Sequence, residues 1–238
     1  MHILLFCLIF VFALDRPAQA QNLRVAVAAN FRDAAREIAD RFSFEHETKV
    51  ALSVGSTGQL AGQILLGAPF DVFLAADRET PAKLIRQGHA NGRNSRPYAL
   101  GRLVLVTSDG TEPLPQRLMD ATRIAVPNPR SAPYGRAAKA YLERSDLWAK
   151  LEDKLVFGQS ASASFAAVRS GAADRGLIAL SLAKTHGVDY WPIPTDQYPA
   201  IEQHVLQVSD TEEAAAFVQF LLSPASESII KKYGYGLP

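Results

Sequence analysis

The feature that most constrains this chain is a local pattern that occurs at four places. In each, an apolar, strand-like run ends in small or hydroxyl residues and then leads into a helix, at Val25–Phe31, Val54–Gly58, Ile124–Gly135 and Phe157–Ser162. The first backbone N–H groups of a helix lack intrahelical partners and carry a partial positive charge. One such helix end needs only a cap. Several that converged would form a dry, neutral pocket for a small anion.

The N-terminal residues are typical of a secretory signal peptide. Residues 3–14 form an apolar run that is too short to span a bilayer comfortably, and Ala18-Gln19-Ala20 is a small-x-small cleavage site. The segment before the run has neither Lys nor Arg, so a buried helix is the alternative interpretation. We predict that residues 1–20 are cleaved and that the mature chain is exported.

Composition and motifs argue against several classes of protein. The sole cysteine, Cys7, lies in the predicted signal peptide, so the mature chain has no disulfide, thiol chemistry or cysteine-bound metal. The formal net charge is +1 without any run of like charges, which gives no indication of a nucleic-acid partner. The sequence has no nucleophile elbow, P-loop or zinc-protease motif. The histidines of the mature chain lack metal-ligand spacing: His46, His89, His186 and His204. We therefore predict no enzyme activity and no cofactor.

Strand-like and helical patterns alternate along the mature chain. Strands are predicted near residues 23–28, 49–54 and 70–75, each followed by a helix. The run at 70–75 is almost wholly apolar, as in a strand that is buried on both faces. A second alternation spans residues 102–180. This order predicts α/β units with parallel-rich sheets flanked by helices.

Two such units predict two lobes with a hinge between them. The crossings are predicted at Pro97–Gly101 and Pro199–His204, so the first lobe comprises residues 21–98 and 204–238 and the second comprises residues 99–203. Two crossings form a hinge, and ligands bind in the cleft between the lobes of such folds.

The set and order of the motifs identify a family. The motifs are Val25–Phe31, Gly55–Ile64, Gly67–Asp77, Asn128–Gly135, Gly176–Ser181 and Ile229–Tyr235. Over nearly the whole mature chain, they resemble the periplasmic molybdate-binding proteins of ABC transporters. The resemblance implies the type II periplasmic-binding-protein fold, in which two α/β lobes are joined by two hinge crossings.

The resemblance also implies a site for an oxyanion. The implied ligand residues are Asn30, Thr57, Tyr134 and Ala161, with Ala29 and Ser56 as neighbours. The first two would offer side-chain donors from the first lobe, and the next two would offer backbone N–H groups from the second. Molybdenum would be held there as molybdate, without direct metal ligands. Whether Ser56 or Thr57 is the main hydroxyl stays open.

Three positions depart from the family pattern. Many relatives have Ser where Asn30 and Thr57 stand, and Tyr where Ala179 stands. A hydroxyl from position 179 is missing, and we expect the hydroxyl of Tyr134 to fill part of its role. Each polar candidate also has a purely structural interpretation as a helix cap, and Tyr134 has one as a hinge aromatic.

The implied function is capture of molybdate, and of tungstate, for delivery to a membrane ABC permease and its ATPase. A tetrahedral dianion only accepts hydrogen bonds, so hydroxyl, amide and backbone donors suit it. The protein is expected to be a periplasmic monomer without a nucleic-acid partner. The alternatives are a binding protein for another oxyanion, such as sulfate, and a secreted α/β hydrolase.

Overall fold

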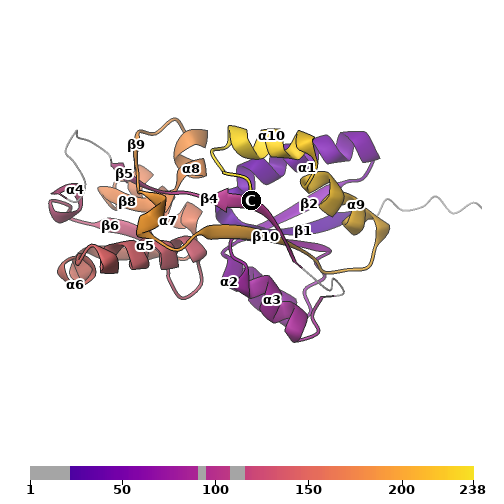
Figure 1. The fold of residues 1–238 in the computed structure, drawn as a ribbon, viewed down its shortest axis with the longest axis horizontal. Helices are drawn as coiled ribbons and strands as arrows, with labels where there is room; N and C mark the ends of the chain where they lie inside the picture. The colour runs from indigo at the N-terminus through magenta and orange to yellow at the C-terminus, as the bar shows by residue number, and fades with distance from the viewer. Residues whose placement is uncertain (1–21, 91–94, 108–115) are drawn as a thin grey trace, which may run out of the picture.

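Two five-stranded sheets flanked by helices make up the part of the chain that the computed structural model describes, which is residues 22–90, 95–107 and 116–238. The sheets form two lobes that lie side by side (Figure 1). This arrangement confirms the predicted two-lobed α/β fold. The predicted signal peptide lies outside the described residues. Among those residues, no helix combines the length and apolar character needed to cross a membrane.

The sheet of the first lobe combines parallel and antiparallel strands. Its order is β2-β1-β3-β10-β4, with β1 parallel to β2 and β3, and β10 antiparallel to β3 and β4. The strands are β1 (Leu23–Ala28), β2 (Val50–Gly55), β3 (Val72–Ala75), β4 (Arg96–Gly101) and β10 (Ile201–Gln207). As predicted from its composition, β3 is buried along its whole length.

Helices cover both faces of this sheet, as Figure 1 shows. On one face lie α1 (Arg32–His46), α9 (Glu212–Leu221) and α10 (Pro224–Lys232); on the other lie α2 (Thr57–Leu65) and α3 (Glu79–Arg86). The inward side of α1 is a stripe at helical spacing, formed by Ala34, Ala35, Ile38 and Phe42. Between β1 and α1, the chain makes the single 3-10 turn η1 (Ala29–Phe31).

The second lobe repeats this plan around the order β7-β6-β8-β5-β9. Its strands are β5 (Leu103–Thr107), β6 (Ile124–Pro127), β7 (Leu155–Gly158), β8 (Arg175–Ala179) and β9 (Tyr190–Pro192). Its helices are α4 (Gln116–Met119), α5 (Pro133–Arg144), α6 (Trp148–Leu151), α7 (Ala161–Arg169) and α8 (Leu180–Thr185), with the 3-10 turns η2 (Glu152–Lys154) and η3 (Thr195–Gln197). One apolar core unites this lobe.

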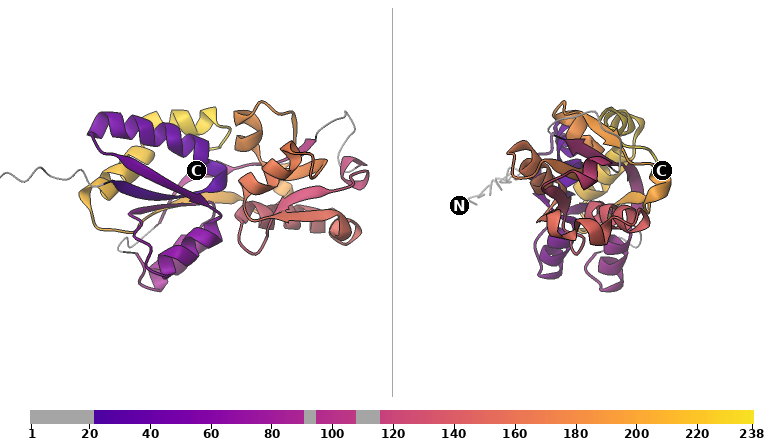
Figure 2. Two further views of the ribbon diagram at one scale, coloured as in Figure 1. Left: turned by 180° about the vertical axis from the view of Figure 1, so that it is seen from behind. Right: turned by 90° about the vertical axis from the view of Figure 1, so that its left-hand side faces the viewer.

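The two predicted crossings are themselves strands. The segments Pro97–Gly101 and Pro199–His204 were expected to be connections, but they contribute to β4 and β10, which pair antiparallel within the first sheet. Pro97 concealed the first of these strands, because proline lacks the N–H that a central strand needs. It is tolerated because β4 lies at the edge of the sheet. β4 and β10 then lead directly to the second lobe, as the rear view in Figure 2 shows.

A glycine permits the close contact between α5 and the end of β6. A Cβ on Gly135 would collide with the backbone carbonyl group of Pro127. The first turn of α5 can therefore lie directly on the carboxyl end of β6, which fixes where its N–H groups point. Gly62 in α2 has no such constraint, since a Cβ there would meet no atom within 4 Å.

We expect Gly135→Ala to lower the free energy of unfolding by about 1–3 kcal/mol, the usual cost of overpacking. The matched variant Gly62→Ala should raise it by about 0.5–1 kcal/mol, because alanine is the better helix former and the site is open. Urea denaturation followed by circular dichroism measures both. Equal effects of the two variants would contradict a close backbone contact at Gly135.

Candidate ligand-binding site

A small cavity lies between the lobes, where the carboxyl ends of β1, β2, β6 and β7 meet. The space between the protein atoms here is about 200 Å³ when the open solvent at its mouth is included. Its lining residues are Ala28, Ala29, Asn30, Ser56, Thr57, Ala76, Ala132, Pro133, Tyr134 and Ala161. All the site residues predicted from the sequence are among them, and none of the lining residues carries a formal charge. The four places where a strand leads into a helix, identified from the sequence, therefore converge from both lobes on one neutral cavity.

Helix starts supply this cavity with backbone donors. Ser56 is the N-cap of α2, and its hydroxyl accepts the N–H of Gln59, the third helical residue, at 3.3 Å. Ser160 is the N-cap of α7, and its hydroxyl accepts the N–H of Ala163, again the third helical residue, at 3.2 Å. Each cap therefore leaves the first N–H of its helix, at Thr57 and Ala161, without an intrahelical partner.

The helix α5 presents its donor in a different way. It begins at Pro133, whose ring nitrogen carries no hydrogen, and its N-cap residue Ala132 has no side chain that could accept a bond. The first N–H that α5 can offer is therefore that of Tyr134. Proline at this position also fixes the backbone in helical geometry, so this donor is held in place without a polar cap.

Thr57, rather than Ser56, has a hydroxyl proton to offer. Thr57 Oγ1 accepts the N–H of Ala76 at 3.0 Å, and no bond among the described residues uses its own proton. Ser56 Oγ donates to Gln59 Oε1 at 3.0 Å and also accepts the Gln59 N–H, so the capping box occupies it fully. The sequence left open whether Ser56 or Thr57 offers the main hydroxyl, and the geometry favours Thr57.

The Asn30 side chain makes contacts that the sequence did not indicate. Asn30 lines the cavity, but its amide nitrogen donates to Gln203 Oε1 at 2.9 Å and to the Tyr235 hydroxyl at 3.1 Å. Both amide hydrogens are therefore used within the first lobe. What Asn30 can present to the cavity is its backbone N–H, which lies in the first turn of η1 and has no partner within that turn.

The Tyr134 hydroxyl also lies away from the place that was expected for it. A Cβ on Gly101 would collide with this hydroxyl, so the side chain extends to the hinge strand β4, which does not line the cavity. Burial raises the pKa of the Tyr134, Tyr98 and Tyr235 phenols above their ordinary value. All three therefore stay neutral at physiological pH, and no phenolate adds negative charge beside the cavity.

Contacts between the lobes close the rim of the cavity. The N–H of Gly58 donates to the carbonyl of Ser131 at 2.9 Å, and Gln59 Nε2 donates to Gln159 Oε1 at 3.0 Å. Arg136 forms an ion pair with Asp77, whose other oxygen accepts the N–H of Thr80 at 2.8 Å. Asp77 thus satisfies an N–H in the first turn of α3, one residue before the N-cap Arg78, and also binds the second lobe.

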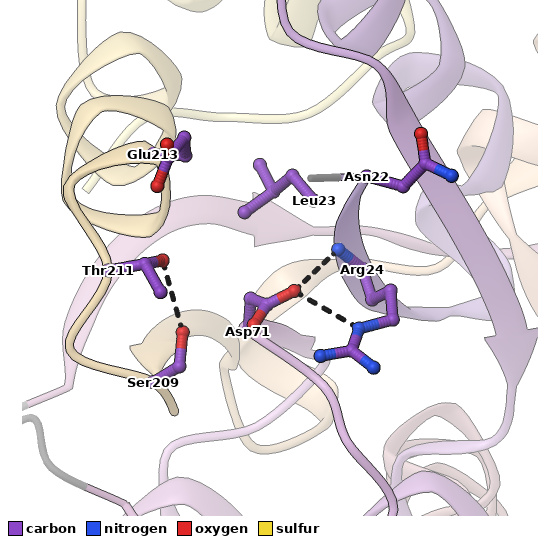
Figure 3. Close-up of a pocket in the computed structure, with 7 residues that line it drawn as sticks. All are labelled: Asn22, Leu23, Arg24, Asp71, Ser209, Thr211 and Glu213. Carbon is purple, nitrogen blue, oxygen red and sulfur yellow. Dashed lines mark hydrogen bonds and ion pairs between the residues drawn. The ribbon is translucent and has the colours of Figure 1, made fainter. Parts of the chain in front are cut away.

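A larger pocket at the opposite edge of the first sheet has unsuitable chemistry for an anion (Figure 3). Asp71 and Glu213 line it, and two carboxylates would repel a negative ligand. Asp71 accepts the backbone N–H of Arg24 at 2.8 Å and its Nε at 3.4 Å, which joins β1 to the start of β3. This agrees with the structural role expected for Asp71. The described residues hold no cluster of three or more potential metal-ligating His, Cys, Asp or Glu side chains.

Comparison with known proteins agrees with this geometry. The family model for bacterial extracellular solute-binding proteins matches residues 23–236. The chain belongs to this family. A relative in Rhodobacter capsulatus, named molybdate-binding protein ModA, is 37% identical over 96% of this chain and 93% of its own. The ModA of Azotobacter vinelandii is 38% identical over 92% of each chain.

Solved structures of solute-binding proteins share the fold. The periplasmic molybdate-binding protein of Azotobacter vinelandii superposes with a TM-score of 0.85 at 33% identity, covering 91% of this chain and all of that one. The sulfate-binding protein SubI of Mycobacterium tuberculosis has a TM-score of 0.73 at 15% identity, over 90% of this chain and 85% of its own, and so shares the fold alone. The matched family and these relatives are named as binding proteins, which confirms the prediction that this chain is not an enzyme.

We expect Asn30→Ala to lower the free energy of unfolding by about 1–3 kcal/mol, since it removes two buried hydrogen bonds and leaves their partners unsatisfied. The control is Asn22→Ala, because Asn22 is exposed and should contribute less than about 0.5 kcal/mol. Thermal and urea denaturation of the ligand-free protein measure the difference. If the two variants are equally stable, the Asn30 amide is not held as the structure shows.

Proposed function

We propose that this solute-binding protein captures molybdate, and tungstate as well, outside the cytoplasm and delivers it to a membrane ABC permease. The observation that carries the proposal is the convergence of η1, α2, α5 and α7 on one uncharged cavity between the lobes. The names of the relatives that match almost the whole chain support molybdate as the ligand.

The donor set suits a tetrahedral dianion. Such an anion only accepts hydrogen bonds, and the cavity offers backbone N–H groups and the hydroxyl proton of Thr57. No carboxylate lines it to repel the ligand. Each helix N-terminus contributes about 0.3–1 kcal/mol towards a nearby anion when exposed, and up to about 2 kcal/mol when partly buried. Several dipoles therefore balance the ligand charge without a cationic side chain.

The apolar part of the cavity wall would set the size of the ligand. Alanines from both lobes line the cavity: Ala28, Ala29, Ala76, Ala132 and Ala161. Sulfate offers the same acceptors as molybdate in a smaller tetrahedron, so discrimination depends on how far apart the donors are fixed. Phosphate at neutral pH carries a proton, which needs an acceptor, and no carboxylate lines the cavity to provide one.

The proposal includes the route of the protein and its partners. Residues 1–20 would direct export and be removed, which leaves a periplasmic chain with its first described strand beginning at Leu23. Closure of the lobes around the anion would be the state that the permease and its ATPase recognise. The protein would act as a monomer, since each chain carries a complete cavity.

Calorimetric titration of the mature protein with molybdate, tungstate, sulfate and phosphate tests the proposal. We expect molybdate and tungstate to bind with one ion per chain, and sulfate and phosphate to bind at least about a hundredfold more weakly, or about 2.7 kcal/mol. Tight sulfate binding without molybdate binding would assign the chain to sulfate instead. Failure of every oxyanion to bind would end the proposal.

Thr57→Ala should weaken molybdate binding at least about tenfold, because it removes one hydrogen bond to a charged ligand. Thr57→Ser keeps the hydroxyl and should stay close to the unmodified protein. Thr211→Ala is the matched control, since Thr211 also accepts a backbone N–H, that of Ala214 at 3.2 Å, but lies outside the cavity. An affinity for Thr57→Ala equal to that of Thr211→Ala would remove Thr57 from the site.

A further inference from the structure

Two serine hydroxyls of the second lobe bind the backbone of the first lobe directly behind the cavity. Ser162 Oγ, in the first turn of α7, donates to the carbonyl of Ala29 at 3.0 Å. Ser181 Oγ, in the first turn of α8, donates to the carbonyl of Asn30 at 2.8 Å. The two acceptors are consecutive carbonyls of η1, the turn between β1 and α1.

The bond from Ser162 reaches the same peptide unit that offers a donor to the cavity. In a trans peptide the carbonyl oxygen and the following N–H lie in one plane and point in opposite directions, so the Ala29 carbonyl and the Asn30 N–H extend to opposite sides of the bond that joins these residues. A hydroxyl that donates to the carbonyl fixes this plane and polarises its N–H. The neighbouring residue Ala161 lines the cavity, so one turn of α7 contacts both the cavity and the back of η1.

The bond from Ser181 joins a buried hydrogen-bond network. The Tyr235 hydroxyl lies 2.6 Å from the Asn30 carbonyl and 2.9 Å from Ser181 Oγ, and it accepts the Asn30 amide. Ser181 and Tyr235 are 4% and 5% exposed, so water does not compete strongly for these bonds. Tyr235 belongs to the first lobe and Ser181 to the second, so the network is complete only when the lobes are together.

These contacts differ in kind from the ion pair at the rim. Arg136 has a side chain that is 46% exposed, so salt screens its attraction to Asp77. The serine hydroxyls are neutral, and their bonds should keep their strength at high salt. They also contact the ligand turn itself, whereas Arg136 contacts the start of α3.

Resting on the proposed function, we propose that Ser162 and Ser181 are positioning residues. They hold the η1 turn of the first lobe so that its N–H groups face the anion, and they do so only in the closed state. Closure then strengthens the donors of the first lobe, and the bound anion in turn favours closure. The two serines slow the release of the anion without touching it.

Stopped-flow dissociation of molybdate from Ser162→Ala and Ser181→Ala tests this inference. Each variant should release molybdate about three- to tenfold faster, the effect of one neutral hydrogen bond, with an association rate within about twofold of the unmodified protein. Ser162→Thr keeps a hydroxyl at a half-buried position and should restore slow release. The ratio of the release rates of variant and unmodified protein should be the same at 0.5 M NaCl, because the serine hydrogen bonds join neutral groups.

Ser170→Ala is the matched control, since Ser170 Oγ donates to the Ala167 carbonyl at 3.2 Å within the second lobe. The melting temperature of the ligand-free protein is the second readout. A bond that forms on closure should leave this temperature unchanged in Ser162→Ala and reduce only the stabilisation that molybdate provides.

The outcomes separate this inference from the proposed function. If the unmodified protein binds no oxyanion, the proposed function fails and the positioning role fails with it. If it binds molybdate but Ser162→Ala releases the ion at the rate of Ser170→Ala, only the positioning role is overturned. The same holds if Ser162→Ala lowers the melting temperature of the ligand-free protein and leaves the release rate unchanged, which indicates a structural role alone.

Discussion

The unsatisfied N–H groups at the start of each helix are the constraint on which the rest of the structure depends. A buried N–H without a partner costs free energy, so a helix start normally lies in water or is capped completely. Here the caps at Ser56 and Ser160 satisfy later N–H groups, and the first N–H of each helix belongs to a residue that lines the cavity, Thr57 or Ala161. Two five-stranded sheets hold these ends together, and an anion would supply the missing acceptors.

Sequence reasoning found the four strand-to-helix junctions from local patterns, and the resemblance to the molybdate-binding family implied that their residues share one site. The carboxyl ends of parallel strands meet at one edge of a sheet, and β1 is parallel to β2 just as β6 is parallel to β7. The two junctions of each lobe are therefore brought together by strand pairing alone, whereas the meeting of the two lobes depends on packing. The buried strand β3 and the cap at Asp77 were predicted for the same reason, since composition and capping chemistry are local.

The choice of partner for each polar side chain could not be predicted in this way. The amide of Asn30 binds Gln203, which lies 173 positions further along the chain, and the Asn30 carbonyl accepts a bond from Ser181, 151 positions away. Nothing near Asn30 in the sequence indicates either contact. The same applies to β4, where the pairing with β10 outweighs the irregularity that Pro97 indicates.

Tyr134 couples the cavity to the hinge through a single residue. Its N–H is the first donor of α5, while its hydroxyl contacts Gly101, the last residue of β4 before the chain enters the second lobe. Its side chain is 1% exposed, so a movement of α5 relative to β4 must displace a buried phenol. Opening of the lobes would therefore disturb the donor and the hinge together. Ser162 and Ser181 make the corresponding link from α7 and α8 to η1. Each lobe thus contacts backbone of the other beside the cavity, and with the proposed function ligand binding and lobe closure would depend on the same contacts.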